Sequence, residues 1–191
     1  MMYLFFDTET TGIPRNYKAP ASDLTNWPRI VQLAWLTTAA DGHEIGCAEH
    51  LIKPDGFEIP NDAAKIHGIT TKIANETGTE LNIVLARIEK DLMNVNTIVA
   101  HNMQFDEKVL GAEFLRTGRP NIVTTKAKIC TMQLSTEFCQ LPGPYGYKWP
   151  TLQELHLKLF NISFQGAHRA LSDVRACAAC YFELKRRGIE A

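Results

Sequence analysis

One stretch limits what this chain can fold into more than any other: residues 3–12, with the sequence YLFFDTETTG. Four apolar residues lead directly into Asp7 and Glu9. Alternate residues of a β-strand share a face, so these two carboxylates point to one side and Thr8 points to the other. Because the strand is so apolar, we expect it to be central in its sheet. There, two adjacent carboxylates repel each other unless a cation lies between them. A divalent metal ion would resolve the conflict. The alternative is a strand whose acidic end meets solvent, and this stretch alone does not decide between them.

The length and charge of the chain narrow its class. A chain of 191 residues suits one domain with a substantial core, and we expect residues 1–191 to form a single domain. Hydrophobic residues make up 45% and charged residues 21%, which is typical of a soluble globular protein. The net charge of −1 argues against a protein that coats nucleic acid by charge alone, but it permits one that binds a chain end.

The cysteines and the apolar runs indicate where the protein works. Its five cysteines are odd in number and scattered, which favours reduced thiols in the cytoplasm over a disulfide framework. We interpret Cys177 and Cys180 as small packing residues of a helix, with a zinc site as the weaker alternative. The first apolar run lacks a preceding basic region and stops at Asp7, so no signal peptide is expected. No apolar window of 18 residues occurs, and we expect no membrane partner.

Strand signals come mainly from the first part of the chain. Further strands are predicted over residues 31–36 and 44–52, and the Asp41-Gly42 turn between them predicts an antiparallel meander of the first three strands. Residues 97–101 form a short buried strand in this prediction. Residues 128–134 fit either a strand or the start of a helix, and residues 139–150, rich in proline and aromatic residues, are predicted to be a loop.

Helical spacing of apolar residues predicts helices over residues 61–66, 81–92, 103–117 and 170–187, and another that has Pro150 in its first turn. The first of these has Asn61 as its expected N-cap and closes at Gly68. Strands followed by alternating helices and strands indicate an α/β fold.

A second acidic motif is AHNMQFD at residues 100–106. If a helix begins near Met103, Asp106 lies in its first turn, where the partial positive charge of the helix N-terminus keeps the carboxylate ionised. That is a suitable state for a metal ligand. The alternative is that aspartate is simply favoured in first turns.

The third motif is GAHRALSD at residues 166–173. On one helix, His168 and Asp173 would lie roughly 140° apart and could not act on the same group. We therefore place His168 in the loop before a helix and Asp173 early in that helix. The alternative for His168 is an ordinary hydrogen-bonded surface histidine.

Taken together, the three motifs resemble those of the DEDDh, or DnaQ-like, 3′–5′ exonuclease superfamily. The resemblance is carried by FDTETTG at residues 6–12, by His101-Asn102 with Phe105-Asp106, and by His168 with Asp173. In addition, PRIVQLA at residues 28–34 resembles the second strand of that superfamily, and IHGIT at residues 66–70 resembles a signature of its proofreading-subunit branch. The expected catalytic positions are all matched: Asp7, Glu9, Asp106, His168 and Asp173.

This resemblance implies a fold and a metal site. The fold would be ribonuclease-H-like, with a five-stranded mixed sheet, formed by the meander plus parallel strands, flanked by helices. Two Mg²⁺ or Mn²⁺ ions would be held by four carboxylates, whose charges they balance: Asp7, Glu9, Asp106 and Asp173. Oxygen ligands suit these ions better than zinc.

The resemblance also implies an activity. The protein would be a metal-dependent 3′–5′ exonuclease acting on single-stranded or frayed ends, DNA favoured, and releasing nucleoside 5′-monophosphates. The ions would activate a water and steady the departing oxygen, while His168 removed the proton of that water. The terminal nucleotide would be bound by residues around the motifs: Thr8, Thr10, Thr11, Gly12, His67, Asn102 and Phe105.

Several alternatives remain open from the sequence. No residue in the sequence shows whether a 2′-hydroxyl would be accepted or excluded, so an RNA-trimming exonuclease is one alternative. A non-catalytic module that binds nucleic-acid ends is another. The protein would work alone or with a DNA polymerase subunit. The aromatic side chains of Tyr145, Tyr147 and Trp149 would stack on substrate or contact a partner, unless Trp149 fills the core at a helix start.

Overall fold

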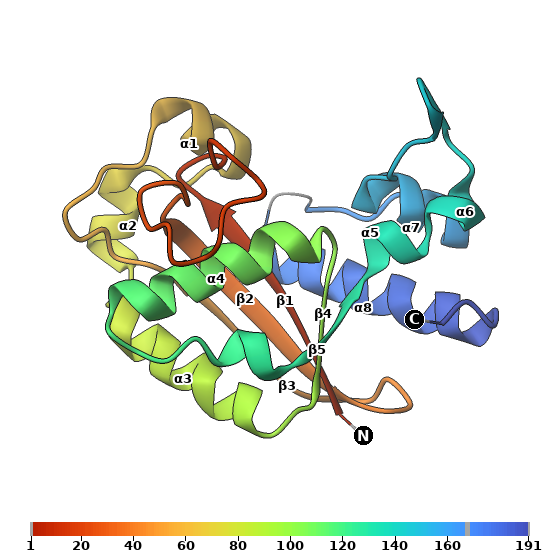
Figure 1. The fold of residues 1–191 in the computed structure, drawn as a ribbon, viewed down its shortest axis with the longest axis horizontal. Helices are drawn as coiled ribbons and strands as arrows, with labels where there is room; N and C mark the ends of the chain where they lie inside the picture. Colours follow the sequence, from red (N-terminus) through yellow and green to blue (C-terminus); the bar gives the residue numbers. More distant parts are fainter. Residues whose placement is uncertain (1, 167–168, 191) are drawn as a thin grey trace.

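A computed structural model describes residues 2–166 and 169–190. It contains a five-stranded mixed sheet in the order β3-β2-β1-β4-β5 (Figure 1). The antiparallel part is the predicted meander of β1 (Met2–Thr10), β2 (Ile30–Ala39) and β3 (Glu44–Leu51). Next to β1, the sheet continues in parallel through β4 (Thr97–Ala100) and β5 (Ala127–Cys130). The predicted five-stranded mixed sheet is confirmed.

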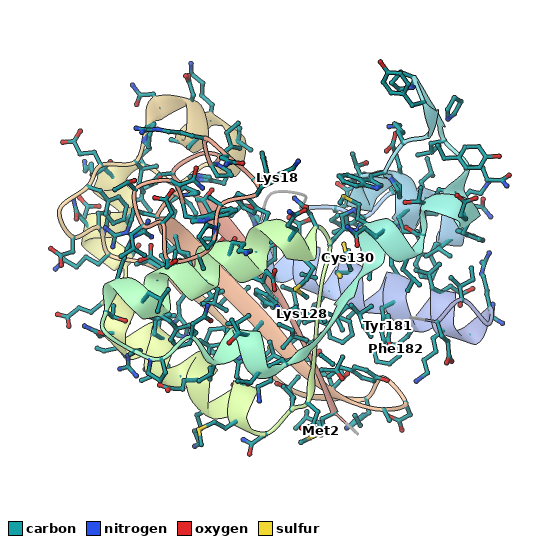
Figure 2. All side chains as sticks on the ribbon, viewed as in Figure 1. Met2, Lys18, Lys128, Cys130, Tyr181 and Phe182 are labelled. Atoms are coloured by element: carbon teal, nitrogen blue, oxygen red, sulfur yellow. The ribbon has the colours of Figure 1, made fainter. Side chains whose placement is uncertain are left out.

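Strand β1 is central because both of its faces are buried. Leu4 and Phe6 lie in the core under α3 (Leu81–Met93), α4 (Met103–Arg116) and the 3-10 helix η1 (Ile122–Thr125). Tyr3 and Phe5 face the other way and pack against α8 (Ala170–Arg186), on which Tyr181 and Phe182 are labelled in Figure 2. A strand buried on both faces has a continuous apolar run, and this accounts for the start of the chain.

Two short helices, α1 (Asn61–His67) and α2 (Thr71–Thr77), cover the end of β2 around Val31. The predicted N-cap was wrong: Pro60 holds that position and Asn61 is already helical, with no side-chain cap bond. Gly68 ends α1 as predicted, in the left-handed region at φ 78°. Helix α2 was not predicted, although Thr70 caps it by accepting a hydrogen bond from the backbone N–H of Ile73.

Residues 128–134, which fitted either a strand or the start of a helix, contain both. After β5 come two short helices, α5 (Thr131–Leu134) and α6 (Thr136–Cys139). Residues 139–150 are not entirely a loop, because Pro142–Gly143 (β6) and Gly146–Tyr147 (β7) pair as a small hairpin.

Helix α7 (Leu152–Phe160) packs on α8 through Leu155, Leu159 and Leu184. Pro150 precedes this helix rather than lying in its first turn. Thr151 is the N-cap and forms a reciprocal capping box with Glu154, a pair of hydrogen bonds that a proline at that place could not supply.

The structure also bears on the cysteines and on the possibility of a membrane-spanning helix. All five cysteines are free thiols, and Cys177 and Cys180 are buried in separate apolar clusters on α8. Within residues 2–166 and 169–190, no helix is both long and apolar enough to span a membrane.

Candidate active site

Three carboxylates from two elements meet beside the sheet. Asp7 and Glu9 come from β1 and share the face that packs on α8, as their alternation predicted, and Asp173 lies in the first turn of α8. One carboxylate oxygen from each residue lies within 4.8 Å of the others, and all three side chains are half-buried. The sheet and the helix thus bring together acids that are far apart in sequence.

The start of α8 is fixed by side chains of the sheet. The backbone N–H of Ala170 donates to Oε1 of Gln32 at 3.2 Å, and that of Leu171 donates to Oε1 of Glu49 at 3.2 Å. The first N–H groups of a helix have no partner within it, so these two bonds stabilise the helix end and hold Asp173 in place. Sequence reasoning missed both residues. The available signal was Gln32, a polar side chain inside the apolar run of β2.

Asp106 approaches from the opposite face. It lies in the first turn of α4, as predicted, and only 3% of it is exposed. Its Oδ1 accepts hydrogen bonds from the backbone N–H of Thr8 at 3.1 Å and from the Thr8 hydroxyl at 2.7 Å. Among the described side chains, the group within 4.8 Å comprises Asp7, Glu9 and Asp173 without Asp106. Thr8 therefore anchors the fourth acid, a different contact from the substrate contact expected of it.

The carboxylates raise one another's pKa. Burial raises the pKa of Asp7 well above its usual range, and the charges of Asp106, Asp173 and Glu9 raise it further. Burial, with a contribution from Asp173, raises the pKa of Glu9 to about 7. The pKa of Asp106 is also raised to about 7, because burial outweighs the two hydrogen bonds from Thr8. Without a cation, these acids resist ionisation at neutral pH.

This arrangement fits a divalent metal ion. Every donor is a carboxylate oxygen, the ligand type preferred by Mg²⁺ and Mn²⁺. A nearby positive charge would remove the repulsion that raises the pKa of Asp7 and Glu9.

We predict that the metal-free protein loses stability as pH rises. Glu9 and Asp106 titrate near 7 when folded, whereas unfolded acids titrate at roughly 4. The folded state therefore binds more protons between these values, so stability is highest below about pH 4, falls through the window up to about pH 7, and levels off above it. In chelator, Tm should drop by on the order of 10 °C between about pH 5 and pH 8, and Mn²⁺ should remove most of this drop.

The control for this prediction is Glu9→Gln, which removes one of the titrating groups. In chelator its Tm should decline less steeply with pH than that of the unchanged protein. Equal slopes for the two proteins would show that other groups cause the pH dependence.

A cavity of about 380 Å³ adjoins the acids, between residues 8–13 and α1. Six of the seven residues predicted to bind substrate line it: Thr8, Thr10, Thr11, Gly12, His67 and Phe105. Asn102 does not line it. The backbone of Asn102 is in the left-handed region at φ 77°, and its carbonyl accepts a hydrogen bond from Phe105 at 2.9 Å.

The threonine hydroxyls at the mouth of this cavity have partners within the chain. Thr10 donates to the carbonyl of Gly12 at 2.6 Å, and Thr11 accepts from the backbone N–H of Arg29 at 3.0 Å. Apart from Glu9, sequence reasoning missed the remaining lining residues, which include two large apolar side chains, Ile13 and Ile66, that are 75% and 61% exposed. Both could have been recognised as large apolar side chains in or next to a motif, since Ile13 follows residues 6–12 and Ile66 begins residues 66–70.

His168, the expected general base, lies outside the described residues. The structure describes its surroundings from Gly166, which has φ 82°, and from Arg169, the N-cap of α8. The role of His168 therefore stays a prediction.

Solved structures share this fold. Exonuclease I of E. coli in complex with a dA16 oligonucleotide is 24% identical, with a TM-score of 0.77, over 97% of this chain and 41% of that chain. The zinc ion bound form of an E. coli Exonuclease I complex with single-stranded DNA has the same values. Exonuclease I from Methylocaldum szegediense is 24% identical, with a TM-score of 0.76, over 97% of this chain and 40% of that chain.

This chain thus spans about two fifths of the length of those proteins. The shared fold is the ribonuclease-H-like fold that the motifs implied. A comparison with curated protein sequences finds no match. A family model described as Exonuclease, RNase T, matches residues 4–181, which is most of the chain. The chain therefore belongs to the RNase T family of exonucleases, in agreement with the resemblance of its motifs to those of the DEDDh superfamily.

Proposed function

We propose that this protein is a metal-dependent 3′–5′ exonuclease that removes nucleotides from single-stranded or frayed ends, with DNA favoured. The observation that carries the proposal is the convergence of Asp7, Glu9 and Asp173 beside a cavity of about 380 Å³. A cavity of this size is at the lower end of the range for small-molecule sites, and it suits one terminal nucleotide. The solved structures of E. coli Exonuclease I with oligonucleotides support a single strand as substrate.

In this proposal, the four acids hold two Mg²⁺ or Mn²⁺ ions: Asp7, Glu9, Asp106 and Asp173. When bound, such ions supply an activated water and stabilise the charge that develops on the phosphate and the leaving oxygen. The chain contributes orientation. Thr8 fixes Asp106 through two hydrogen bonds, and Gln32 and Glu49 fix the helix that carries Asp173. Products would be nucleoside 5′-monophosphates.

The cavity would hold the terminal nucleotide. Ile13, Ile66 and Phe105 supply apolar surface for a base, which gains by leaving water. The hydroxyls of Thr10 and Thr11 bind within the loop, so we assign them the role of shaping it rather than contacting substrate. Neither set of contacts depends on base identity, in keeping with an enzyme that removes successive nucleotides.

We assign His168 as the general base that takes the proton of the attacking water. A histidine with its ordinary pKa of about 6.5 is mostly neutral near neutral pH and still basic. His168→Ala should lower the hydrolysis rate by about 10²–10⁴-fold and flatten the rise in rate between about pH 6 and pH 9. The control is His43→Ala, an exposed histidine in the β2–β3 turn. A His168→Ala variant with the full rate across this range would assign the proton to another group.

The function is tested with matched labelled substrates in the presence of Mg²⁺ or Mn²⁺: single-stranded DNA, duplex DNA with a mispaired end, and RNA. We expect nucleoside 5′-monophosphates to be released from the 3′ end, fastest from single-stranded DNA. Faster release from RNA would favour the exoribonuclease alternative. Tight binding without release of mononucleotide would favour the non-catalytic module, and release from the 5′ end would contradict the proposal.

Our proposal names nucleic acid alone as the partner. The sequence left open whether the protein works alone or with a DNA polymerase subunit, and no observation supports such a subunit. In the structure, Gly68 ends α1 and Thr70 caps α2. We also propose a cytoplasmic location, which the odd number of scattered, free cysteines supports.

A further inference from the structure

Three aromatic side chains are exposed on the β6–β7 hairpin. We call residues 142–149 the arm. Tyr145 is 101% exposed, Tyr147 is 46% exposed and Trp149 is 57% exposed. Trp149 therefore does not fill the core at the start of α7. Large rings left in water are a sign of a binding surface when they cluster.

The arm is held firmly at its base. Lys148 donates from its backbone N–H to the carbonyl of Leu141 at 2.9 Å, and its ammonium group pairs with Glu154 at 2.5 Å. Glu154 also belongs to the capping box at the start of α7. These contacts connect the base of the arm to the start of α7.

A half-buried histidine, His101, connects the base of the arm to the active-site end of the sheet. Nε2 of His101 lies 3.0 Å from the carbonyl of Pro150, and Nδ1 lies 3.0 Å from the hydroxyl of Thr131. A carbonyl only accepts, so Nε2 carries the proton and Nδ1 accepts from the hydroxyl. Burial lowers the pKa of His101 to about 4, so it stays neutral at physiological pH. His101 follows β4 and precedes α4, the helix that carries Asp106.

The spacing of the rings suits flat partners. Strand β7 ends at Tyr147, and a single residue, Lys148, separates Tyr147 from Trp149. The ammonium group of Lys148 pairs with Glu154. Two residues of chain span at most roughly 6.6–7.2 Å, at about 3.3–3.6 Å per residue. This reach is about twice the separation of stacked bases, roughly 3.4 Å, so the chain is long enough for one base to enter between the two rings.

We propose that the arm is a second nucleic-acid-binding site, at which Tyr147 and Trp149 stack on unpaired bases of the strand being degraded. This inference rests on the proposed function. Figure 1 shows the arm projecting from α6 and α7, away from α1, which lines the cavity. It would therefore meet bases several nucleotides from the 3′ end. Paired bases already stack on each other, so the site favours single strands, and bases of DNA and RNA both qualify.

The composition of the arm favours bases over a protein partner. Residues 142–149 are PGPYGYKW, with flat rings, one cation and no aliphatic side chain apart from the two prolines. Aromatic rings interleaved with a basic residue are typical of surfaces that bind single-stranded nucleic acid. A protein-docking surface would more often present a continuous apolar patch.

The arm contains a natural probe. Of the three tryptophans in the chain, Trp27 is 3% exposed and Trp35 is 2% exposed, whereas Trp149 is 57% exposed. We expect oligo(dT) of about 15 nucleotides, added in chelator to prevent cleavage, to quench the emission of Trp149 by stacking. A dinucleotide and a blunt duplex should not quench it. Trp149→Phe, which keeps a ring, should remove the signal and retain the affinity.

Affinity is measured with a labelled oligomer of the same length. Loss of one stacked base weakens binding by about 5- to 100-fold, and we expect losses in this range for Tyr147→Leu and Trp149→Leu. With metal present, KM for the long oligomer should rise while the rate on a dinucleotide stays unchanged. The matched control is Leu157→Ala, an exposed apolar residue of α7, which should bind like the unchanged protein. A parallel titration with oligo(U) shows whether RNA is also bound.

The outcomes separate the arm from the proposed function. If the protein degrades oligomers but the leucine variants bind them as tightly as the unchanged protein, the inference about the arm is wrong and the proposed function stands. Equal quenching by blunt duplex would also overturn stacking. If the oligomer quenches Trp149 and binding depends on the rings but no mononucleotide is released, the arm binds nucleic acid and the proposed function fails.

Discussion

Asp7→Asn is expected to abolish hydrolysis, with a loss of at least about 10⁴-fold in kcat/KM. Burial raises the pKa of Asp7 well above its usual range, and the charges of Asp106, Asp173 and Glu9 raise it further. In the proposed mechanism it is a ligand of the metal ions, whose contribution to the transition state is several kcal/mol. At about 1.36 kcal/mol per factor of ten, loss of that contribution accounts for the expected fall in rate.

The same change is expected to raise Tm in chelator. Asparagine has the shape of aspartate but no charge, so it removes repulsion from a site that is crowded with acids. Loss of activity together with a gain in stability separates a functional acid from a structural one. Rates and Tm should be compared with those of Glu137→Gln, an exposed acid of α6 outside the group, which should change neither.

Two outcomes would contradict this account of Asp7. Retention of clearly more than about 0.01% of the activity would show that Asp7 contributes less to the transition state than a metal ligand should, at about 1.36 kcal/mol per factor of ten. A lower Tm in chelator would show that Asp7 stabilises the fold, and the repulsion inferred for the metal-free site would be wrong.

Local rules predicted the elements that carry the acids. Alternation along a strand placed Asp7 and Glu9 on one face, and first-turn preferences placed Asp106 and Asp173 at helix starts, as observed. Periodicity could not show that α4 and α8 cover opposite faces of the sheet, because this depends on how the chain crosses over it. The convergence of the acids was inferred only from the order of the motifs.

What the sequence did not predict depends on contacts between distant residues. Gln32 and Glu49 cap the start of α8 from two strands far away in the chain. Helix α2 is short, and it is stabilised by the packing of Ala74 against Val31 of β2. The buried charge of Glu113 is a third case. Glu113 lies on α4 among apolar residues, and no local pattern shows that two of its partners are Arg29, just before β2, and Ile30, the first residue of β2.

Glu113→Ala is expected to lower the free energy of unfolding by about 3–5 kcal/mol, the usual effect of removing one partner of a buried ion pair. Glu113 is fully buried, and its Oε1 accepts from Nε of Arg29 at 2.9 Å and from the backbone N–H of Ile30 at 3.0 Å. The same oxygen lies 3.1 Å from Nη1 of Arg116. Alanine would leave these donors without their acceptor, so Tm should fall by on the order of 10 °C.

The effect should reach the active site through Arg116. This side chain donates to the carbonyls of Leu24 at 2.7 Å and Trp27 at 2.6 Å, and so holds the loop of residues 11–29, whose first residues line the cavity. Glu113→Ala should therefore raise KM more than it lowers kcat at temperatures where the variant is still folded. Glu113→Gln keeps an acceptor oxygen and should lose less stability than the alanine variant.

The matched control is the exposed pair of Arg175 and Glu44, with side chains 53% and 44% exposed. Solvent screens such a pair, so Glu44→Ala should cost less than about 1 kcal/mol. Urea unfolding of both alanine variants measures how much free energy of unfolding each one loses, provided that the dependence of this free energy on urea concentration is the same for both. Similar losses of stability for Glu113→Ala and Glu44→Ala would mean that burial does not strengthen the interactions of Glu113 with Arg29 and Arg116. The loop around the cavity would then be held by its own internal hydrogen bonds, such as that between Asn16 and Asn26.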